Sequence, residues 1–173
     1  ALETPIFVKT HWLPMAFYLP GEYAINISRH PGPVLKSWWR MLACQTDRPI
    51  PIEKVIVGNV IFGSWSSYHD AWQKTLVKLG DRGLSLRFQE VALNPAQEAT
   101  KIADMISQSF DQRAEIPTFD DLRKNSPAYY SSGATGPNPG EYTEHQWQLL
   151  VATHGNVMRK LGYSMQQDVA ASQ

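Results

Sequence analysis

Cysteine is almost absent from this 173-residue chain, because Cys44 is its single example. One thiol cannot build an internal disulfide framework, and such scarcity is typical of reducing compartments. No apolar run approaches the roughly 20 residues that a membrane span requires. Residues 1–10 also lack the basic stretch and the long apolar core of a signal peptide. The sequence therefore predicts a cytoplasmic protein.

Net charge is absent as well. Lysine plus arginine number 16 and aspartate plus glutamate number 16, so the formal net charge is zero. A neutral chain creates no bulk field that would attract nucleic acid or an anionic membrane, so neither is expected as a partner. Any anion site must then be local. Hydrophobic residues make up 43% of the chain, which is enough for a single domain, residues 1–173, with its own core.

Short β-favouring runs alternate with longer stretches of helical periodicity. The expected strands are 6–10, 23–28 and 84–88, and the expected helices are 34–44, 52–61, 65–79, 95–110 and 144–161. This alternation predicts an α/β fold, a three-layer domain with a parallel sheet flanked by helices. Residues 126–143 are rich in glycine, proline and serine. We expect them to form a flexible loop or lid.

Two of the expected strands end in polar residues. The end of the first carries Lys9 and Thr10 and is followed by His11, and the second is followed by Arg29, with Ser37 eight residues later. Ligands of parallel α/β sheets bind at the carboxyl ends of the strands. Imidazole exchanges its proton near neutral pH, so His11 is a candidate general base. Arg29 and Ser37 can converge on one phosphate, and the residues alone predict an anion site.

Each of these residues also has a simpler interpretation. His11 fits an ordinary hydrogen-bonded loop histidine, and Arg29 fits an ion pair with a carboxylate. Ser37 fits a plain helix serine. The aromatic stripe of Trp65, Tyr68 and Trp72 is more typical of a core than of a ligand platform. No histidines share a metal-ligand spacing.

Five segments of the chain, in order, resemble the cytosolic sulfotransferases. Residues 7–14 are similar to that family's F-x-K-T-H-x-P segment, and residues 28–37 to its R-N-P-x-D-x-x-x-S segment. The others are 57–65 (V-G-x-x-x-Y-G-S-W), 86–95 (L-x-Y-E-D-x-x-x-N-P) and 119–126 (F-x-x-M-K-x-N-P). Each segment alone is a weak signal, but five in the right order are specific. The resemblance implies a P-loop-NTPase-like sheet.

The resemblance also implies a reaction and its cofactor. The family moves a sulfuryl group from 3′-phosphoadenosine 5′-phosphosulfate (PAPS) to an acceptor hydroxyl, releasing the bisphosphate PAP, and no metal is implied. His11 corresponds to the catalytic base and Lys9 to a residue that stabilises the transferring group. Arg29 and Ser37 correspond to the ligands of the 3′-phosphate, and Phe88 to the aromatic residue that contacts adenine.

The acceptor is expected to be a small hydroxyl compound such as a phenol. Four residues just past the base are expected to line its pocket: Trp12, Met15, Phe17 and Tyr18. Near the C-terminus, Ser131, Ser132 and Gly133 occupy the position of the family's cofactor-binding R-K-G. A homodimer is left open.

The chain departs from the family pattern in three places. The family's first strand and P-loop are expected ahead of residue 1, and no glycine-rich turn with lysine and serine or threonine occurs within the chain. Ser131 and Ser132 stand where the family has two cationic side chains. In the segment 28–37, His30, Gly32 and Pro33 differ from the family pattern. An alternative is therefore a truncated or degenerate domain with a binding or assembly role. A third is an ordinary nucleotide-binding module.

Overall fold

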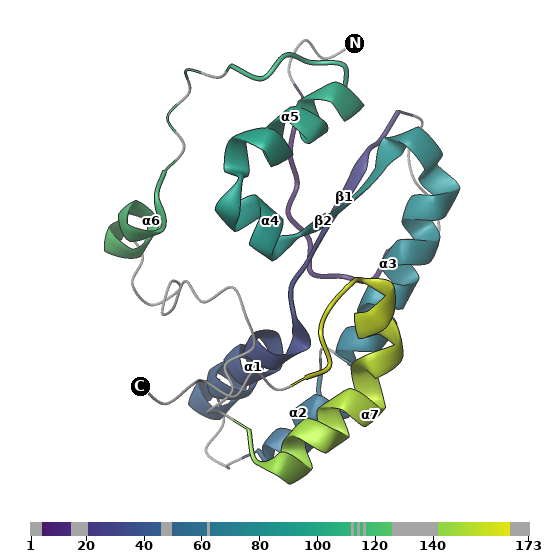
Figure 1. Cartoon of the computed structure of the whole chain (residues 1–173), viewed down its shortest axis with the longest axis vertical. Coiled ribbons are helices and arrows are strands. Elements are labelled where there is room, and N and C mark those ends of the chain that lie inside the picture. Colours follow the sequence, from purple (N-terminus) through teal and green to yellow (C-terminus); the bar gives the residue numbers. More distant parts are fainter. Residues whose placement is uncertain are drawn as a thin grey trace.

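The computed structural model describes residues 5–14, 21–45, 50–61, 63–111, 113, 115, 117–125 and 142–166. Within them, two parallel strands form the centre of the fold (Figure 1). β1 (Ala24–Ser28) pairs with β2 (Gly83–Arg87) in a register that runs from Ala24 opposite Gly83 to Ser28 opposite Arg87. Because the strands are parallel, their carboxyl ends lie side by side.

Helices flank this sheet on both sides in Figure 1. α3 packs against both strands, while α4 and α5 contact β2 from the other side. The helices are α1 (Pro31–Gln45), α2 (Ile52–Ile56), α3 (Trp65–Leu79), α4 (Phe88–Leu93), α5 (Pro95–Met105), α6 (Phe119–Asn125) and α7 (Glu144–Lys160), with a 3₁₀ turn, η1 (Gly80–Arg82), before β2. The α/β class with a parallel sheet flanked by helices is confirmed. No helix in the described ranges is both long and apolar enough to cross a membrane.

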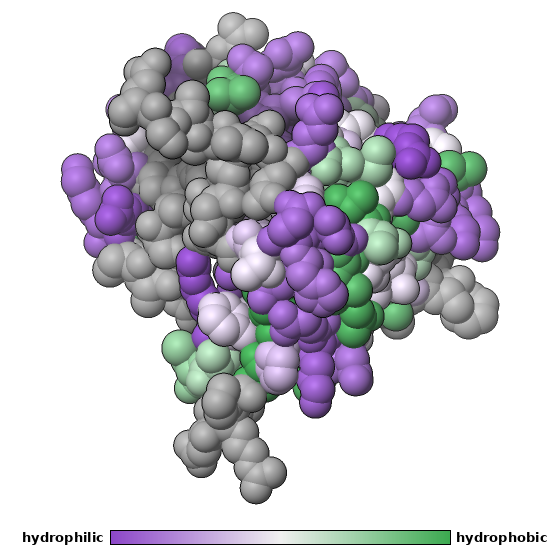
Figure 2. Space-filling view, turned by 60° about the horizontal axis from the view of Figure 1, so that its bottom comes forward, coloured by the Kyte–Doolittle hydropathy of each residue, from purple (hydrophilic) through white to green (hydrophobic). Residues whose placement is uncertain are grey.

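The main core lies where α1, α2, α3 and α7 meet. Leu35, Val55, Ile56, Leu150 and Met158 are completely inaccessible to solvent there. α7 starts at a capping box in which Thr143 and Gln146 satisfy each other's backbone amides. On the face that comes forward in Figure 2, hydrophobic residues show as narrow bands between hydrophilic ones. The apolar faces of the helices are thus largely buried in this core.

Several expected boundaries are wrong. The helix expected over residues 52–61 ends at Ile56, because Gly58 has a φ of +79° and its α-carbon faces the Ser64 backbone too closely for any side chain. The helix expected to reach residue 110 ends at Met105. Ser64 precedes α3 but makes no side-chain cap bond to it. α4 was not anticipated. The loop expected over 126–143 lies almost wholly outside the described residues.

The strand expected over residues 6–10 is also not formed. Residues 5–14 have no strand assignment, and Ile6, Phe7 and Val8 are 73%, 68% and 82% exposed. A β-favouring run becomes a strand only when another strand supplies hydrogen-bond partners. Among the described residues only β1 and β2 pair, so the run has no partner and forms no strand.

Candidate functional site

The site lies at the carboxyl ends of β1 and β2. The Ser28–Arg87 pair ends the register, so Arg29 and Phe88 directly follow two adjacent strand ends. The guanidinium carbon of Arg29 lies 4.5 Å from the centre of the Phe88 ring. The indole Nε1 of Trp65 donates to the Arg29 carbonyl at 3.2 Å, which fixes the backbone where the chain leaves β1. The structure therefore brings together two of the expected cofactor residues.

Arg29 is half-buried, and its surroundings affect its charge. Burial lowers the pKa of its guanidinium below the usual value, while the nearby Tyr163 opposes that change. Arginine nevertheless remains charged at neutral pH. A partly desolvated guanidinium over an aromatic face is a stronger electrostatic partner for an anion than one in water. Arg29 thus has the character of an anion-binding residue.

His30, which follows Arg29, is 2% exposed and held in one tautomer. The backbone amide of Gly32 donates to its Nδ1 at 3.0 Å, so Nδ1 carries no proton. Its Nε2 lies 3.2 Å from the carbonyl oxygen of Ser164, which can only accept. Nε2 therefore carries the proton, and the ring is neutral. The ring also stacks on Trp147 and meets Tyr163 edge-on.

Tyr163 is placed by the way α7 ends. Gly162 has a φ of +74°, its amide donates to the Arg159 carbonyl, and the amide of Tyr163 donates to the Met158 carbonyl. This is the Schellman ending, which prefers glycine at the left-handed position. It directs Tyr163 onto β1, where the phenol oxygen lies 2.9 Å from Ser28 Oγ.

The direction of that hydrogen bond follows from its neighbours. Ser28 Oγ donates its single proton to the Leu86 carbonyl at 3.3 Å, so Tyr163 donates to Ser28. The phenol oxygen can then only accept from any further group. Burial, the main cause, also raises the pKa of Tyr163 and keeps it neutral.

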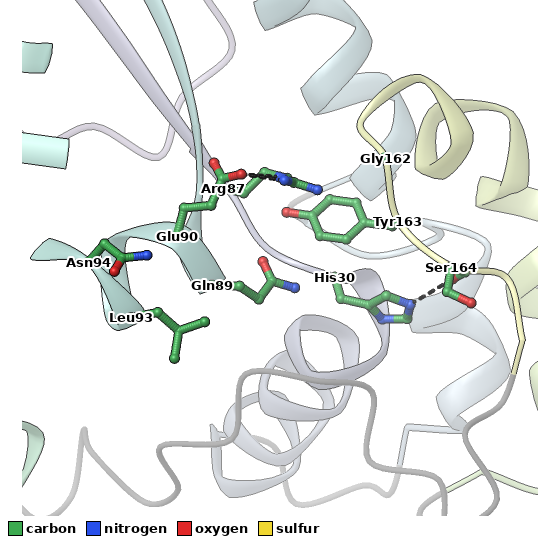
Figure 3. A pocket seen from close by; sticks show the side chains of 9 residues that line it. All are labelled: His30, Arg87, Gln89, Glu90, Leu93, Asn94, Gly162, Tyr163 and Ser164. Atoms are coloured by element: carbon green, nitrogen blue, oxygen red, sulfur yellow. Dashed lines mark hydrogen bonds and ion pairs between the residues drawn. The ribbon is translucent and has the colours of Figure 1, made fainter. Parts of the chain in front are cut away.

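A pocket of about 340 Å³ opens beside these residues (Figure 3). Its walls come from both strand ends and from the chain after α7, and its lining residues are His30, Arg87, Gln89, Glu90, Leu93, Asn94, Gly162, Tyr163 and Ser164. Arg87 pairs with Glu90, with its Nε 2.9 Å from Glu90 Oε1. This pair holds the pKa of Glu90 below and that of Arg87 above its usual value. Arg29 and Phe88 adjoin the pocket in sequence but do not line it.

The expected base lies on the extended N-terminal segment. Lys9, His11 and Trp12 are exposed, Trp12 by 81%. The Trp12 carbonyl accepts from the indole of Trp72 on α3 at 3.3 Å, which holds this segment against α3. Neither Lys9 nor His11 lines the pocket at the strand ends.

The remaining expected residues are only partly covered by the structure. Ser37 lies exposed on α1. Six of them fall outside the described residues: Met15, Phe17, Tyr18, Ser131, Ser132 and Gly133. Among the residues that are described, no group of three or more histidine, cysteine, aspartate or glutamate side chains could hold a metal ion.

Sequence reasoning missed Trp147, Tyr163 and the pocket. One local signal was available, since Leu161-Gly162-Tyr163 has the pattern of a helix stop followed by an apolar contact. That pattern places the end of α7 but does not say which strand Tyr163 will meet.

Comparison with known proteins is consistent with this arrangement. The family model described as the sulfotransferase domain matches residues 1–147. The chain therefore belongs to the sulfotransferase domain family.

Two curated relatives are more specific. Mouse sulfotransferase 1B1 is 27% identical over 121 residues, which cover 64% of this chain and 40% of the relative. Mouse sulfotransferase 1E1 is 24% identical over 144 residues, which cover 75% of this chain and 48% of the relative. The matched part of the chain thus spans under half the length of these relatives.

A solved structure shares the fold. The crystal structure of mouse sulfotransferase SULT7A1 complexed with PAP superposes with a TM-score of 0.65 at 16% identity, covering 82% of this chain and 62% of that one. At this identity the similarity supports the α/β fold and nothing finer.

Proposed function

We propose that this chain is the part of a PAPS-dependent sulfotransferase that carries the catalytic base and the ligands of the donor's 3′-phosphate. The observation that carries the proposal is the contact of Arg29 with Phe88 at the carboxyl ends of adjacent parallel strands. These are the residue types that a phosphorylated adenosine needs, a planar cation for the phosphate and an aromatic face for the base. The PAP in the solved SULT7A1 structure agrees with such a ligand.

The residues of the site fit PAPS in their chemistry. Arg29 and Ser37 would hold the 3′-phosphate, one with its planar fork and the other with a hydroxyl. Phe88 would pack against adenine. When bound, PAPS supplies the sulfuryl group that is transferred. No metal takes part in the proposed chemistry.

The chain's own residues would act on the acceptor. His11 would accept the proton of the acceptor hydroxyl as the new oxygen–sulfur bond forms, and Lys9 would stabilise the charge that develops on the transferring oxygens. Trp12, Met15, Phe17 and Tyr18 would give the acceptor an apolar wall. We therefore propose a small hydroxyl compound, such as a phenol, as the acceptor, and the cytoplasm as the compartment.

A second function is supported by one feature of the sequence. Ser131 and Ser132 stand where the family pattern has cations. The replacement of two cations by hydroxyls favours a domain that binds PAP-like molecules or assembles with partners without catalysis. The intact Lys9-Thr10-His11 favours the enzyme.

Radiolabelled sulfate transfer from PAPS to a panel of phenols distinguishes the two functions. The assay uses residues 1–173, an N-terminally extended chain, and His11→Ala in both. We expect slow transfer by the short chain, because it lacks the phosphate loop of the family pattern. Each oxyanion donor that is lost costs about 10²–10³-fold in rate. In the extended chain, His11→Ala should lower the rate about 10²–10⁴-fold. His145→Ala, on the exposed face of α7, is the matched control.

Two results of this assay would overturn parts of the proposal. Transfer by the extended chain that His11→Ala leaves unchanged would exclude His11 as the base. An extended chain that binds PAP but transfers nothing would support the non-catalytic alternative.

A further inference from the structure

The pocket beside Tyr163 has no role in the proposed donor site. It lies between the ends of β1 and β2 and the chain that follows α7, and neither Arg29 nor Phe88 lines it. Figure 3 shows Gln89 extending from α4 toward Tyr163 and His30, so that its amide lies in the middle of the lining side chains. A volume of about 340 Å³ is at the lower end of the range for small-molecule sites. It suits one or two rings rather than a nucleotide.

The charges of the pocket cancel. Arg87 and Glu90 form an ion pair with each other. His30 is neutral, because its Nδ1 accepts from Gly32 and its Nε2 proton is directed at the Ser164 carbonyl. Tyr163 is neutral as well. A charged ligand would lose its hydration without gaining a net opposite charge, so the pocket favours an uncharged one.

Two acceptors in the pocket lack a donor. The proton of Tyr163 goes to Ser28, which leaves the phenol oxygen as an acceptor only. Gln89 Oε1 is buried and has no hydrogen-bond partner among the described residues. A buried amide oxygen without a partner is costly, and that cost is relieved when a ligand supplies an N–H or O–H group. The terminal amide of glutamine turns easily about its last bond, so the oxygen can move to meet a donor.

We propose that this pocket is a second small-molecule site, which takes an uncharged ring compound carrying N–H or O–H donors, with Gln89 as the residue that selects for the donor. Leu93 and the Tyr163 ring provide the apolar faces against which the ring packs. The site is separate from the donor site, so it stands whether or not the proposed sulfuryl transfer is correct.

Three probes of similar size test the proposal on the full 173-residue chain. 4-Hydroxybenzamide is neutral and carries donors, 4-hydroxybenzoate is an anion, and 4-methylacetophenone is neutral and has no N–H or O–H group. Binding is followed by the amide chemical shifts of Gly162 and Ser164 and by the side-chain amide of Gln89. We expect 4-hydroxybenzamide to shift these signals and to bind more tightly than the other two probes.

Gln89→Met tests the selecting residue, because it keeps the length of the side chain and removes the amide. We expect 4-hydroxybenzamide to bind about five- to tenfold more weakly, the effect of one lost hydrogen bond. The thermal midpoint should not fall, since the change also removes a buried oxygen without a partner. Gln97→Met, on the exposed side of α5, is the control and should change neither value.

Other outcomes would overturn the proposal. These are equal affinity for all three probes, tightest binding of 4-hydroxybenzoate, or unchanged affinity of Gln89→Met. If Gln89→Met does not fold, Gln89→Ala takes its place with the same expected loss. PAP titrations of the same variants should be unchanged, which separates this site from the donor site.

Discussion

The guanidinium of Arg29 lies over the ring of Phe88, 4.5 Å from the Arg29 Cζ to the ring centre. Each residue directly follows one of two paired parallel strands, so the contact is fixed by the register of the sheet. A phosphate bound by Arg29 and a base packed on Phe88 would therefore be linked through the contact between these two side chains. We expect the binding energies of the phosphate and of the base to depend on each other.

We expect Arg29→Lys to weaken PAP binding at least tenfold although the charge is kept. Lysine has no planar fork for a phosphate and does not stack on the Phe88 ring as a guanidinium does. Phe88→Leu should also weaken binding, and the double variant should lose less than the sum of the single losses. Calorimetric titration with PAP measures all three. Arg82→Lys, at the opposite end of β2, is the matched control, and strictly additive losses would contradict the coupling.

Gly162→Ala should destabilise the chain by roughly 1–3 kcal/mol. Gly162 has a φ of +74°, and a β-carbon there would lie 3.2 Å from Arg87 Nη1. Gly63→Ala is the matched control, because Gly63 also has a positive φ, +66°, but has open space around it. Urea denaturation of both variants separates backbone strain from the Arg87 contact. Equal losses would show that the contact contributes nothing.

Local patterns predicted the strands at 23–28 and 84–88 and the helices at 65–79 and 144–161 to within one residue of β1, β2, α3 and α7. The periodic aromatic residues of α3 and the glycine after α7 gave boundaries close to those observed, because helical bonds join near neighbours in the chain. The run at residues 6–10 has strand-forming residues, but strand formation depends on a partner elsewhere in the chain.

The candidate site was also predicted only in part from the sequence. Arg29 and Phe88 could be identified by resemblance to a family pattern. The Tyr163–Ser28 bond joins residues 135 positions apart. No spacing in the sequence indicates which strand end the residue after Gly162 will reach, so the pocket between them could not be anticipated.

Tyr163→Phe should lower the free energy of unfolding by about 0.5–1.5 kcal/mol at neutral pH. It removes the bond to Ser28, while Ser28 keeps its own bond to the Leu86 carbonyl. Burial raises the pKa of Tyr163 above its ordinary value of 10.0. The unfolded chain thus loses this proton first, and stability should fall as the pH rises above about 10. Tyr163→Phe should lose less stability there, and Tyr23→Phe, on an exposed residue, should match the wild type.

Acid should destabilise the chain through two buried histidines of the helical layer. Burial is the main cause that lowers the pKa of both His69 and His154 from 6.5 to about 4. His154 lies between Ser66, which is 2.8 Å from its Nδ1, and the Ile56 carbonyl, which is 2.8 Å from its Nε2. Because the carbonyl can only accept, Nε2 holds the proton and Nδ1 accepts from Ser66. A second proton on the ring would break that arrangement.

The sign of the effect follows from which state binds the proton first. Both histidines take up a proton near pH 6.5 in the unfolded chain and only near pH 4 in the folded one. Stability is therefore fully present above about pH 6.5, falls between pH 6.5 and pH 4 by roughly 3 kcal/mol for each histidine, and levels off below. Urea denaturation across this range measures the slope. His154→Gln should reduce the slope by about half at some cost in stability at pH 7, whereas His145→Gln, on the exposed face of α7, should leave it unchanged. A slope that His154→Gln does not alter would show that other groups control the acid response.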